Sequence, residues 1–370
     1  MTLAAGSRVL VVGAGIAGLA AARALARAGF APEVIEREPA SPGAGTGIYL
    51  PGNAARALRA LGLDAEVVER AVEIPRQRFL DHRARLLAEV DVSQLWAGVG
   101  PCLALHRAEL HDALREGADD TPIRVGVTLD RLAQRDGKVE AELSDGTRDE
   151  YDLLVGADGI HSTVRRLAFG DVRARPLGQL AWRLVAPCPE GVTTWSLMLG
   201  RRTAFLMLPI GQGRAYCYCD VDADPGADRS PERLPELLSE FAEPAQSILE
   251  SIGDVHVSAI EEVALDSWVQ GQVVLVGDAA HATSPNMAEG AAMALEDALV
   301  LAKCLAEVAP IPRALAAFES RRRPRTDWVR AQTHRRDRTR KLPPAARNLI
   351  LRTVWPRIFR ANYIPLLADL

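Results

Sequence analysis

An apolar strand that runs directly into a glycine-rich turn and a helix is the feature of this chain that most limits its fold. Residues 9–12 read Val-Leu-Val-Val, and Gly13, Gly15 and Gly18 then follow in the pattern Gly-x-Gly-x-x-Gly. The first glycine permits a tight turn, the second lets the backbone approach a pyrophosphate, and the third lets the helix pack against the strand. The pattern predicts a Rossmann-type unit whose helix N-terminus faces the phosphates of a dinucleotide.

A second strand, predicted over residues 32–36, completes this unit and ends in an acidic side chain, Glu36. A carboxylate at this distance from the glycines accepts hydrogen bonds from a ribose. The cofactor-binding residues predicted in this part of the chain are Gly13, Ala14, Gly15, Ala17, Gly18, Glu36 and Arg37.

Two later segments repeat the passage from an apolar strand into a glycine turn. Residues 151–155 lead into Asp158 and Gly159, and residues 272–276 lead into Asp278 and then a long helix whose start, near Gly290, carries small side chains. Arg107 stands in the first turn of another predicted helix, where its planar guanidinium can bind a phosphate. Local folding alone does not explain three such turns in one chain.

These three motifs, in this order and at these separations, resemble the single-component FAD-dependent aromatic hydroxylases of the para-hydroxybenzoate hydroxylase type, over roughly residues 7–335. The resemblance implies an α/β protein: a Rossmann-like FAD-binding fold with an inserted, mostly antiparallel β-sheet substrate domain and C-terminal helices. It implies tightly but non-covalently bound FAD, with NADH or NADPH as co-substrate. It assigns further FAD contacts to Gly47, Ile48, Arg107, Leu129, Asp158, Asp278, Gly290 and Ala291.

The chain departs from the family pattern after Pro285. Relatives usually read Asn-Leu-Gly-Gln-Gly there, whereas this chain reads Asn-Met-Ala-Glu-Gly and places Glu289 directly before Gly290. A carboxylate at this helix start is tolerated by the helix dipole. It would also raise the cost of an anionic reduced flavin.

The middle of the chain, residues 174–262, alternates apolar and polar residues in four predicted strands and has a predicted helix over residues 231–252. Period-2 alternation puts Tyr216 and Tyr218 on one face of the sheet and Cys217 and Cys219 on the other. Arg183 and Tyr216 are the candidate catalytic residues, since they could pair with an anionic group and orient a hydroxyl. The candidate substrate-binding residues are Phe205, Met207, Tyr218, Pro285 and Asn286.

The activity that the resemblance implies is an NAD(P)H-using monooxygenase of secondary metabolism. It would insert one atom of O2 into an electron-rich, aromatic small molecule through a flavin C4a-hydroperoxide. Hydroxylation is the main expectation, and epoxidation and Baeyer-Villiger insertion use the same chemistry. An FAD-dependent reductase or dehydrogenase on the same fold is the alternative, followed by a non-catalytic FAD-binding protein.

The composition limits the partners, the metal sites and the cellular location that we expect. The net charge is −4, and the basic run at residues 321–341 shows no row of aromatic platforms, so we expect a solvated helix that packs on the FAD-binding domain after Glu296 and Asp297, and no nucleic-acid partner. Five cysteines without C-x-x-C spacing argue against a metal site and a disulfide framework, and they favour a cytoplasmic protein. No apolar segment is long enough to span a membrane. A monomer or a homodimer is expected.

The expected FAD-binding domain is discontinuous, over residues 1–73, 100–173 and 263–341. Residues 74–99 and 174–262 form the expected substrate domain, and residues 342–370 form a C-terminal helical segment.

Overall fold

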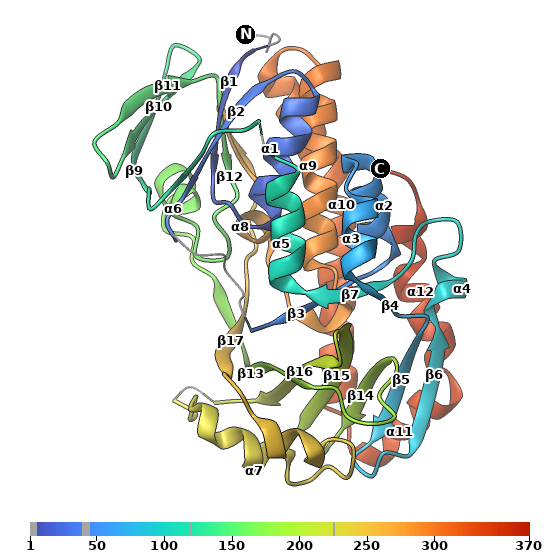
Figure 1. Cartoon of the computed structure of the whole chain (residues 1–370). Coiled ribbons are helices and arrows are strands. Elements are labelled where there is room, and N and C mark those ends of the chain that lie inside the picture. Colours follow the sequence, from blue (N-terminus) through green and yellow to red (C-terminus); the bar gives the residue numbers. More distant parts are fainter. Residues whose placement is uncertain (1–5, 39–44, 119, 225) are drawn as a thin grey trace.

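A computed structural model describes residues 6–38, 45–118, 120–224 and 226–370 of the chain. Two large sheets lie at opposite ends of the molecule, and helices line one side of both (Figure 1). The chain passes between the two ends several times.

The first large sheet contains the predicted glycine turns. Its strand order is β18 (Val269–Gln270), β19 (Val273–Leu275), β12 (Leu153–Gly156), β1 (Arg8–Val12), β2 (Ala31–Glu36) and β8 (Ile123–Val125). All neighbouring pairs are parallel except β18 with β19. Strands β1, β12 and β19 are almost fully buried, which explains their continuous apolar sequences.

Helices cover this sheet. Helix α1 (Ile16–Arg27) follows β1 and packs against α9 (Gly290–Glu307), which in turn contacts α2 (Gly52–Leu61) and α10 (Ile311–Arg340). The shorter helices of this half are α3 (Asp64–Arg70), α5 (Arg107–Glu116), α6 (Thr163–Phe169) and α8 (Asp278–His281).

The second large sheet has the order β17 (His256–Glu262), β13 (Arg175–Pro187), β16 (Arg214–Asp222), β15 (Thr203–Gly211), β14 (Trp195–Leu199), β5 (Arg76–Asp81) and β6 (Leu86–Asp91). Only β14 and β5 pair in parallel. The mixed architecture and the mostly antiparallel second sheet agree with the expected fold class.

The remaining described strands form two small sheets. One is a meander of β9 (Leu129–Arg135), β10 (Lys138–Leu143) and β11 (Arg148–Tyr151) at the edge of the first half. The other joins β3 (Gly47–Leu50), β7 (Leu103–His106) and β4 (Val72–Glu73), and its strands β3 and β7 contact β16 and β15 of the second large sheet.

The helix predicted over residues 231–252 is wrong as a single element. The structure has α7 (Leu234–Leu238) between two 3-10 turns, η1 (Pro231–Arg233) and η2 (Gln246–Ser251). Pro244 accounts for the break, because a proline disfavours helical backbone at the residue before it. These pieces cover the outer face of the second sheet, around Leu234, Leu238 and Phe241.

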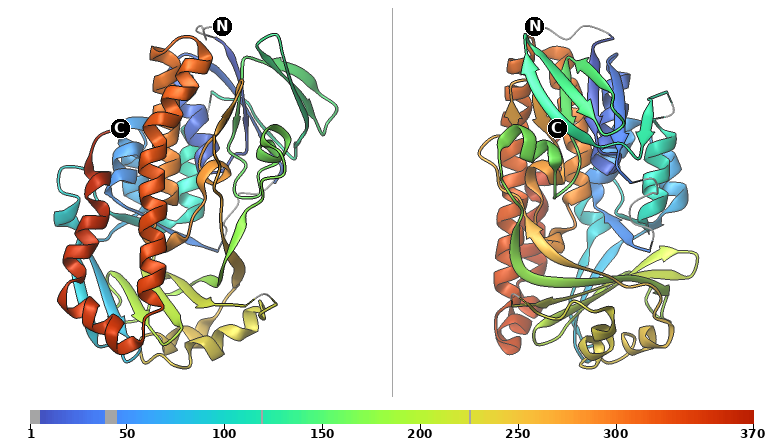
Figure 2. Two further views of the ribbon diagram at one scale, coloured as in Figure 1. Left: turned by 180° about the vertical axis from the view of Figure 1, so that it is seen from behind. Right: turned by 90° about the vertical axis from the view of Figure 1, so that its left-hand side faces the viewer.

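The C-terminal helices hold the two halves together (Figure 2). The long helix α10 starts beside α9, and at its other end Arg340 donates to the carbonyl oxygen of Asp220 in the second sheet. Helices α4 (Val92–Leu95), α11 (Pro344–Thr353) and α12 (Trp355–Leu367) gather around β5 and β6, where Phe79 contacts the rings of Trp355 and Phe359.

Candidate functional site

The three glycine turns meet at the carboxyl ends of β1, β12 and β19. A Cβ atom on Gly13 would lie 2.6 Å from the carbonyl oxygen of Ala157 in the second turn. One on Gly277, in the third turn, would lie 2.8 Å from the Cβ of Ala17. Arg165 is buried and donates from Nη1 to the carbonyl oxygen of Ala279 at 2.9 Å, which joins the second turn to the third.

Within the first turn the three glycines have different surroundings. Gly13 has φ +104°, and a Cβ on Gly18 would overlap the carbonyl oxygen of Gly13. A Cβ on Gly15 would meet no described atom within 4 Å. Two glycines therefore serve packing, while Gly15 leaves one side of the helix N-terminus open, as a bound pyrophosphate requires.

Glu36 lies beside this turn at the end of β2. Its Oε2 accepts from the Ala14 backbone N–H at 2.7 Å, and its Oε1 accepts from the Glu38 N–H at 2.9 Å. The neighbouring Arg37 is exposed and pairs with Glu38. Leu129 is buried at the start of β9, two residues after Val127, whose N–H donates to the Glu36 carbonyl oxygen.

His111 is a residue at this turn that the sequence reasoning missed. It is buried on α5, and its Nε2 lies 2.8 Å from the carbonyl oxygen of Ala14. Its spacing of four residues from Arg107 places both side chains on one face of the helix, and that spacing was the available signal.

Arg107 is the exposed first residue of α5, and its backbone N–H donates to the carbonyl oxygen of Thr46 at 3.0 Å. Gly47 begins β3 directly after Thr46, followed by the half-buried Ile48. A Cβ on Gly47 would overlap the side chain of Tyr216. The glycine therefore lets a strand of the first half approach the second sheet.

Asp158 forms its hydrogen bonds within its own turn. Its carboxylate accepts from the Ser162 hydroxyl and from the N–H groups of Thr163 (2.7 Å) and Val164 (3.0 Å). Burial raises the pKa of Asp158, against these hydrogen bonds. Asp158 thus holds the start of α6 in place. A Cβ on the next residue, Gly159, would meet no described atom within 4 Å.

Asp278 behaves differently, because it is exposed at the start of α8. A Cβ on Gly290, the exposed first residue of α9, would lie 4.0 Å from Asp278 Oδ1. The exposed carboxylate and the N-terminus of α9, with Ala291 half-buried in its first turn, therefore lie side by side.

Asp297 of α9 holds the third turn in place through its carboxylate. Its Oδ2 accepts from the Gly277 N–H at 2.9 Å and lies 2.6 Å from His281 Nε2, while its Oδ1 accepts from Arg322 Nε at 2.7 Å. Burial raises the pKa of Asp297, but the charges of His281 and Arg322 outweigh burial, so that its pKa is lowered overall. The basic helix α10 packs on α9 at Glu296 and Asp297, as expected, but Arg322 is 1% exposed, so the expected solvation is wrong at this residue.

Glu289 is 2% exposed, and its Oε2 accepts from Asn53 Nδ2 of α2 at 2.9 Å. Burial raises the pKa of Glu289 to about 8. The carboxylate expected from the sequence is therefore mostly a neutral acid at pH 7.

A row of four directly paired residues crosses the face of the second sheet that is turned toward the glycine turns. Leu197 pairs with Leu206, Leu206 with Tyr218, and Tyr218 with Arg183. All four are half-buried, whereas the residues of the opposite face are fully buried. We call this set the cross-strand row; it offers an apolar wall that ends in one cation.

Arg183 lies over the Tyr218 ring at 5.3 Å, and its Nη1 donates to Ser258 Oγ at 2.5 Å. Burial raises the pKa of Tyr216, and raises that of Tyr218 well above the usual value, although the charge of Arg183 opposes both shifts. Both phenols therefore stay protonated at neutral pH and can donate hydrogen bonds.

The grouping of Phe205 and Met207 with these residues is wrong. Phe205 pairs with Cys219 and Met207 with Cys217, so both point to the outer face and are fully buried beneath α7. The physical reason is the period of two: Leu206, between them, faces the tyrosines instead.

Pro285 is exposed and Asn286 half-buried on η3 (Pro285–Met287). Asn286 Nδ2 donates to Asp337 Oδ1 at 2.8 Å and to the carbonyl oxygen of Thr333 at 3.1 Å. The side chain therefore fastens this segment to α10.

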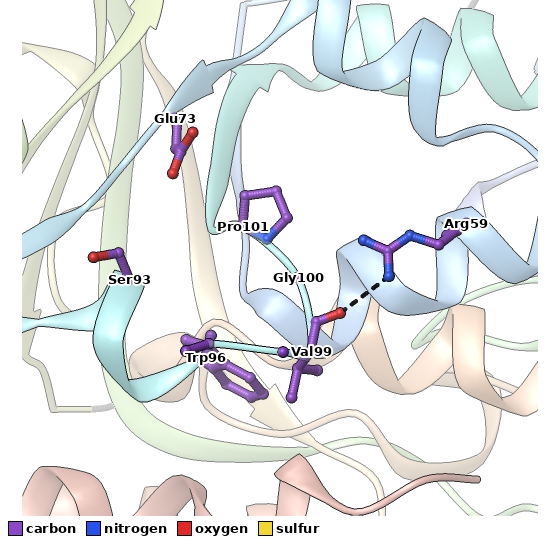
Figure 3. A pocket seen from close by; sticks show the side chains of 9 residues that line it. Arg59, Glu73, Ser93, Trp96, Val99, Gly100 and Pro101 are labelled. Atoms are coloured by element: carbon purple, nitrogen blue, oxygen red, sulfur yellow. Dashed lines mark hydrogen bonds between the residues drawn. The ribbon is translucent and has the colours of Figure 1, made fainter.

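A cavity of about 380 Å³ opens beside the loop over residues 96–101 (Figure 3). Arg59 of α2 donates to the carbonyl oxygen of Val99 there, at 3.4 Å. No predicted site residue lines this cavity, so it is not part of the predicted site.

Within the described ranges, no cluster of His, Cys, Asp and Glu side chains could hold a metal ion. Nor does any described helix combine the length and the apolar character that crossing a bilayer demands.

Residues 7–333 match the sequence profile of a family described as FAD binding domain. The chain is 36% identical to aurachin C monooxygenase/isomerase of Stigmatella aurantiaca, over 89% of this chain and 88% of the relative. It is 37% identical to 2-heptyl-3-hydroxy-4(1H)-quinolone synthase of Pseudomonas aeruginosa (88% and 87% covered) and 30% identical to 6-hydroxynicotinate 3-monooxygenase of Pseudomonas fluorescens (88% and 90%).

Two solved structures are similar in fold. A variant of 2-methyl-3-hydroxypyridine-5-carboxylic acid oxygenase superposes with a TM-score of 0.80 at 28% identity, with 98% of each chain covered. Klebsiella pneumoniae HpxO, complexed with FAD and uric acid, superposes with a TM-score of 0.85 at 24% identity, with 98% of this chain and 95% of that chain covered.

Proposed function

Because the chain belongs to the single-component FAD-dependent aromatic hydroxylase family and is an FAD-dependent monooxygenase, we propose that it hydroxylates a nitrogen-containing aromatic ring that carries an oxo or hydroxyl group and an apolar substituent. The cross-strand row carries this proposal. Its leucines and the Tyr218 ring suit an apolar ring and side chain, and Arg183 suits a polarised or ionised oxygen.

The names of two relatives agree with the nitrogen-containing ring of this substrate class. One relative makes a quinolone with a heptyl chain, and another acts on 6-hydroxynicotinate, a hydroxylated pyridine ring. These two share a nitrogen heterocycle whose oxygen substituent makes the ring electron-rich, and the apolar substituent of the proposed class is that of the heptyl quinolone alone.

The three glycine turns fit FAD. We propose that the first turn holds the pyrophosphate over the open side of Gly15, with Glu36 near the ribose and Arg107 near the phosphates. We assign Asp278 and the start of α9 to the flavin end, because both are exposed and lie side by side. When bound, FAD supplies the redox and oxygen chemistry, with NAD(P)H as electron donor.

The tyrosines then act as neutral hydrogen-bond donors. The raised pKa values of Tyr216 and Tyr218 exclude either phenolate as a base near pH 7. Tyr216 orients the substrate oxygen, and Arg183 favours its anionic form, which makes the ring more electron-rich.

The experiment is a substrate panel of 2-heptyl-4-quinolone, unsubstituted 4-quinolone, 6-hydroxynicotinate and para-hydroxybenzoate. The readouts are substrate-dependent NAD(P)H oxidation and a product heavier by one oxygen atom. We expect the heptyl quinolone to give the highest kcat/KM. Turnover of para-hydroxybenzoate alone would overturn the proposed class.

A matched pair of variants tests the row. Arg183→Met removes the cation over Tyr218, whereas Arg233→Met removes one that lies 5.8 Å over Trp182, on the outer face. We expect KM to rise at least tenfold only in R183M, with FAD content unchanged in both. Equal KM values in the two variants would contradict the assignment of Arg183.

We further propose a cytoplasmic monomer or homodimer that keeps the domain boundaries predicted from the sequence. Five free cysteines support a reducing compartment. Every strand of the seven-stranded sheet falls within residues 74–99 and 174–262, which supports the domain division. Gel filtration with light scattering tests the oligomeric state.

A further inference from the structure

Glu289 stands at a junction of helices directly before the start of α9. Its backbone carbonyl accepts from the Met293 N–H at 2.8 Å, and its side chain reaches Asn53 of α2. The other carboxyl oxygen, Oε1, is buried without a hydrogen-bond partner among the described residues, and so is Asn53 Oδ1. An unpartnered carboxylate oxygen is costly to bury, whereas a protonated one can donate.

The charged groups around Glu289 contact other residues, although Arg336 Nη2 is buried with no hydrogen-bond partner among the described residues. On α9, Glu296 pairs with Arg322 and with Arg325 of α10, each at 2.7 Å. Arg336 of α10 packs over the rings of Trp355, Phe359 and Tyr363, at 5.1 to 5.5 Å.

The groups that face Glu289 electrostatically are Glu296, Arg325, Arg336, Cys102 and Tyr363. Within the described part of the chain, no cation forms an ion pair with the Glu289 carboxyl group itself. Burial is the main reason for its raised pKa, and the charge of Glu296 adds to it.

A neutral acid at this position carries no charge, as the glutamine of the family pattern would. It leaves the positive end of the α9 dipole uncompensated for a bound ligand. The adjoining residue, Gly290, is exposed beside Asp278, at the place that we assign to the flavin. Hydride transfer from NAD(P)H releases NAD(P)⁺ and leaves the flavin with one added negative charge.

We propose that Glu289 couples flavin reduction to a proton: as a neutral acid it permits the negative charge of the reduced flavin, and as a carboxylate it opposes that charge. By linkage, reduction of the flavin then raises the proton affinity of Glu289 by the same factor. The proposal rests on the assignment of the flavin to the start of α9.

The test is the reduction potential of the FAD-loaded protein, measured by dye equilibration from pH 6 to pH 10. The variant is Glu289→Gln, which keeps a neutral polar side chain. The control is Glu307→Gln, which removes an exposed carboxylate from the other end of α9. Unfolding of the FAD-free proteins over the same pH range reports the ionisation of Glu289 without the cofactor.

Equal potentials for wild type and E289Q at pH 6 would support the proposal, provided that the curves separate above pH 8. At pH 10 we expect a tenfold lower ratio of reduced to oxidised flavin in the wild type, which corresponds to about 30 mV for a two-electron couple. E307Q should follow the wild type throughout.

Parallel curves for wild type and E289Q would overturn the coupling and leave the FAD assignment intact. A wild-type protein that failed to bind FAD would overturn the proposed function as well. If E289Q alone failed to bind FAD, the unfolding measurements on the FAD-free proteins would decide. A wild-type free energy of unfolding that shows no titration near pH 8 would overturn the assignment of Glu289 as a neutral acid.

Discussion

Alanine substitutions at Gly15 and Gly18 separate the ligand role of the first glycine turn from its packing role. A Cβ on Gly15 meets no described atom within 4 Å, and its backbone, at φ −75° and ψ −174°, suits alanine. Gly→Ala at such a site stabilises a protein by about 0.4–1 kcal/mol through the entropy of the unfolded chain. We therefore expect G15A to fold at least as well as the wild type without FAD.

Gly18→Ala should have the opposite effect on stability. Its Cβ would overlap the Gly13 carbonyl oxygen and would lie 2.9 Å from the carbonyl carbon, so α1 must move away from the turn. Overpacking of this kind costs about 1–3 kcal/mol, and backbone atoms yield less readily than side chains. We expect a loss of about 3 kcal/mol in the free energy of unfolding.

The assay combines urea unfolding of the FAD-free proteins with FAD titration followed by quenching of flavin fluorescence. We expect G15A to bind FAD at least tenfold more weakly, which is about 1.4 kcal/mol, because the new methyl group occupies the side left open for the pyrophosphate. Gly253→Ala, at an exposed site in the second half, is the control. Wild-type FAD affinity in G15A would refute the ligand role of Gly15, and equal destabilisation of G15A and G18A would refute the packing argument.

Three further predictions concern buried charges and the C-terminal helices. Asp297→Asn removes one of the two carboxylates that pair with Arg322 in a fully buried site, so urea unfolding should show a loss of about 3–5 kcal/mol in the free energy of unfolding. A loss under about 1 kcal/mol would contradict the buried ion pair between Asp297 and Arg322. The folded-state pKa of Glu289 is raised to about 8, above its ordinary value of about 4.5. The contribution of Glu289 to the free energy of unfolding is therefore largest below about pH 4.5, where the side chain is neutral in both states, and it is lost as the pH rises to about 8. Glu289→Gln should therefore stabilise the FAD-free protein relative to wild type by about 3 kcal/mol at pH 7 and by less at pH 5; a difference that does not depend on pH would count against a buried acid. Ending the chain after Lys341 removes the rings that cover Phe79, and thermal denaturation should show a lower Tm; an unchanged Tm would show that α11 and α12 are dispensable for folding.

The three glycine turns were readable from the sequence because each depends on local chemistry. A tight turn after a buried strand needs glycine at set positions, and the order of the turns along the chain is itself a signal. The turns themselves predict a dinucleotide site, and the family resemblance that they carry implied the fold class and the FAD-dependent monooxygenase activity. The helix after the first glycine turn and the strands within residues 174–262 were likewise expected, since the hydrophobic period identifies such elements.

What the sequence left open depends on which surfaces meet. Alternation separated Tyr218 from Cys219, but it did not show that Phe205 belongs with the cysteine, because register between strands is a tertiary property. The basic helix α10 reads as solvated until Arg322 meets Glu296 and Asp297, which lie on a different helix.

Glu289 shows the same division most clearly. Its identity and its place before Gly290 were plain from the sequence, and they suggested a charge at the flavin. Whether that side chain is charged depends on how much water reaches it, and three helices packed together exclude the water. The sequence by itself determined the dinucleotide-binding turns, because these rest on local backbone geometry, and through the family resemblance it implied FAD and the fold. Only the tertiary structure decided which side chains share a face of the second sheet, which ion pairs are buried and whether Glu289 is protonated. All three depend on contacts between segments that are distant in the sequence.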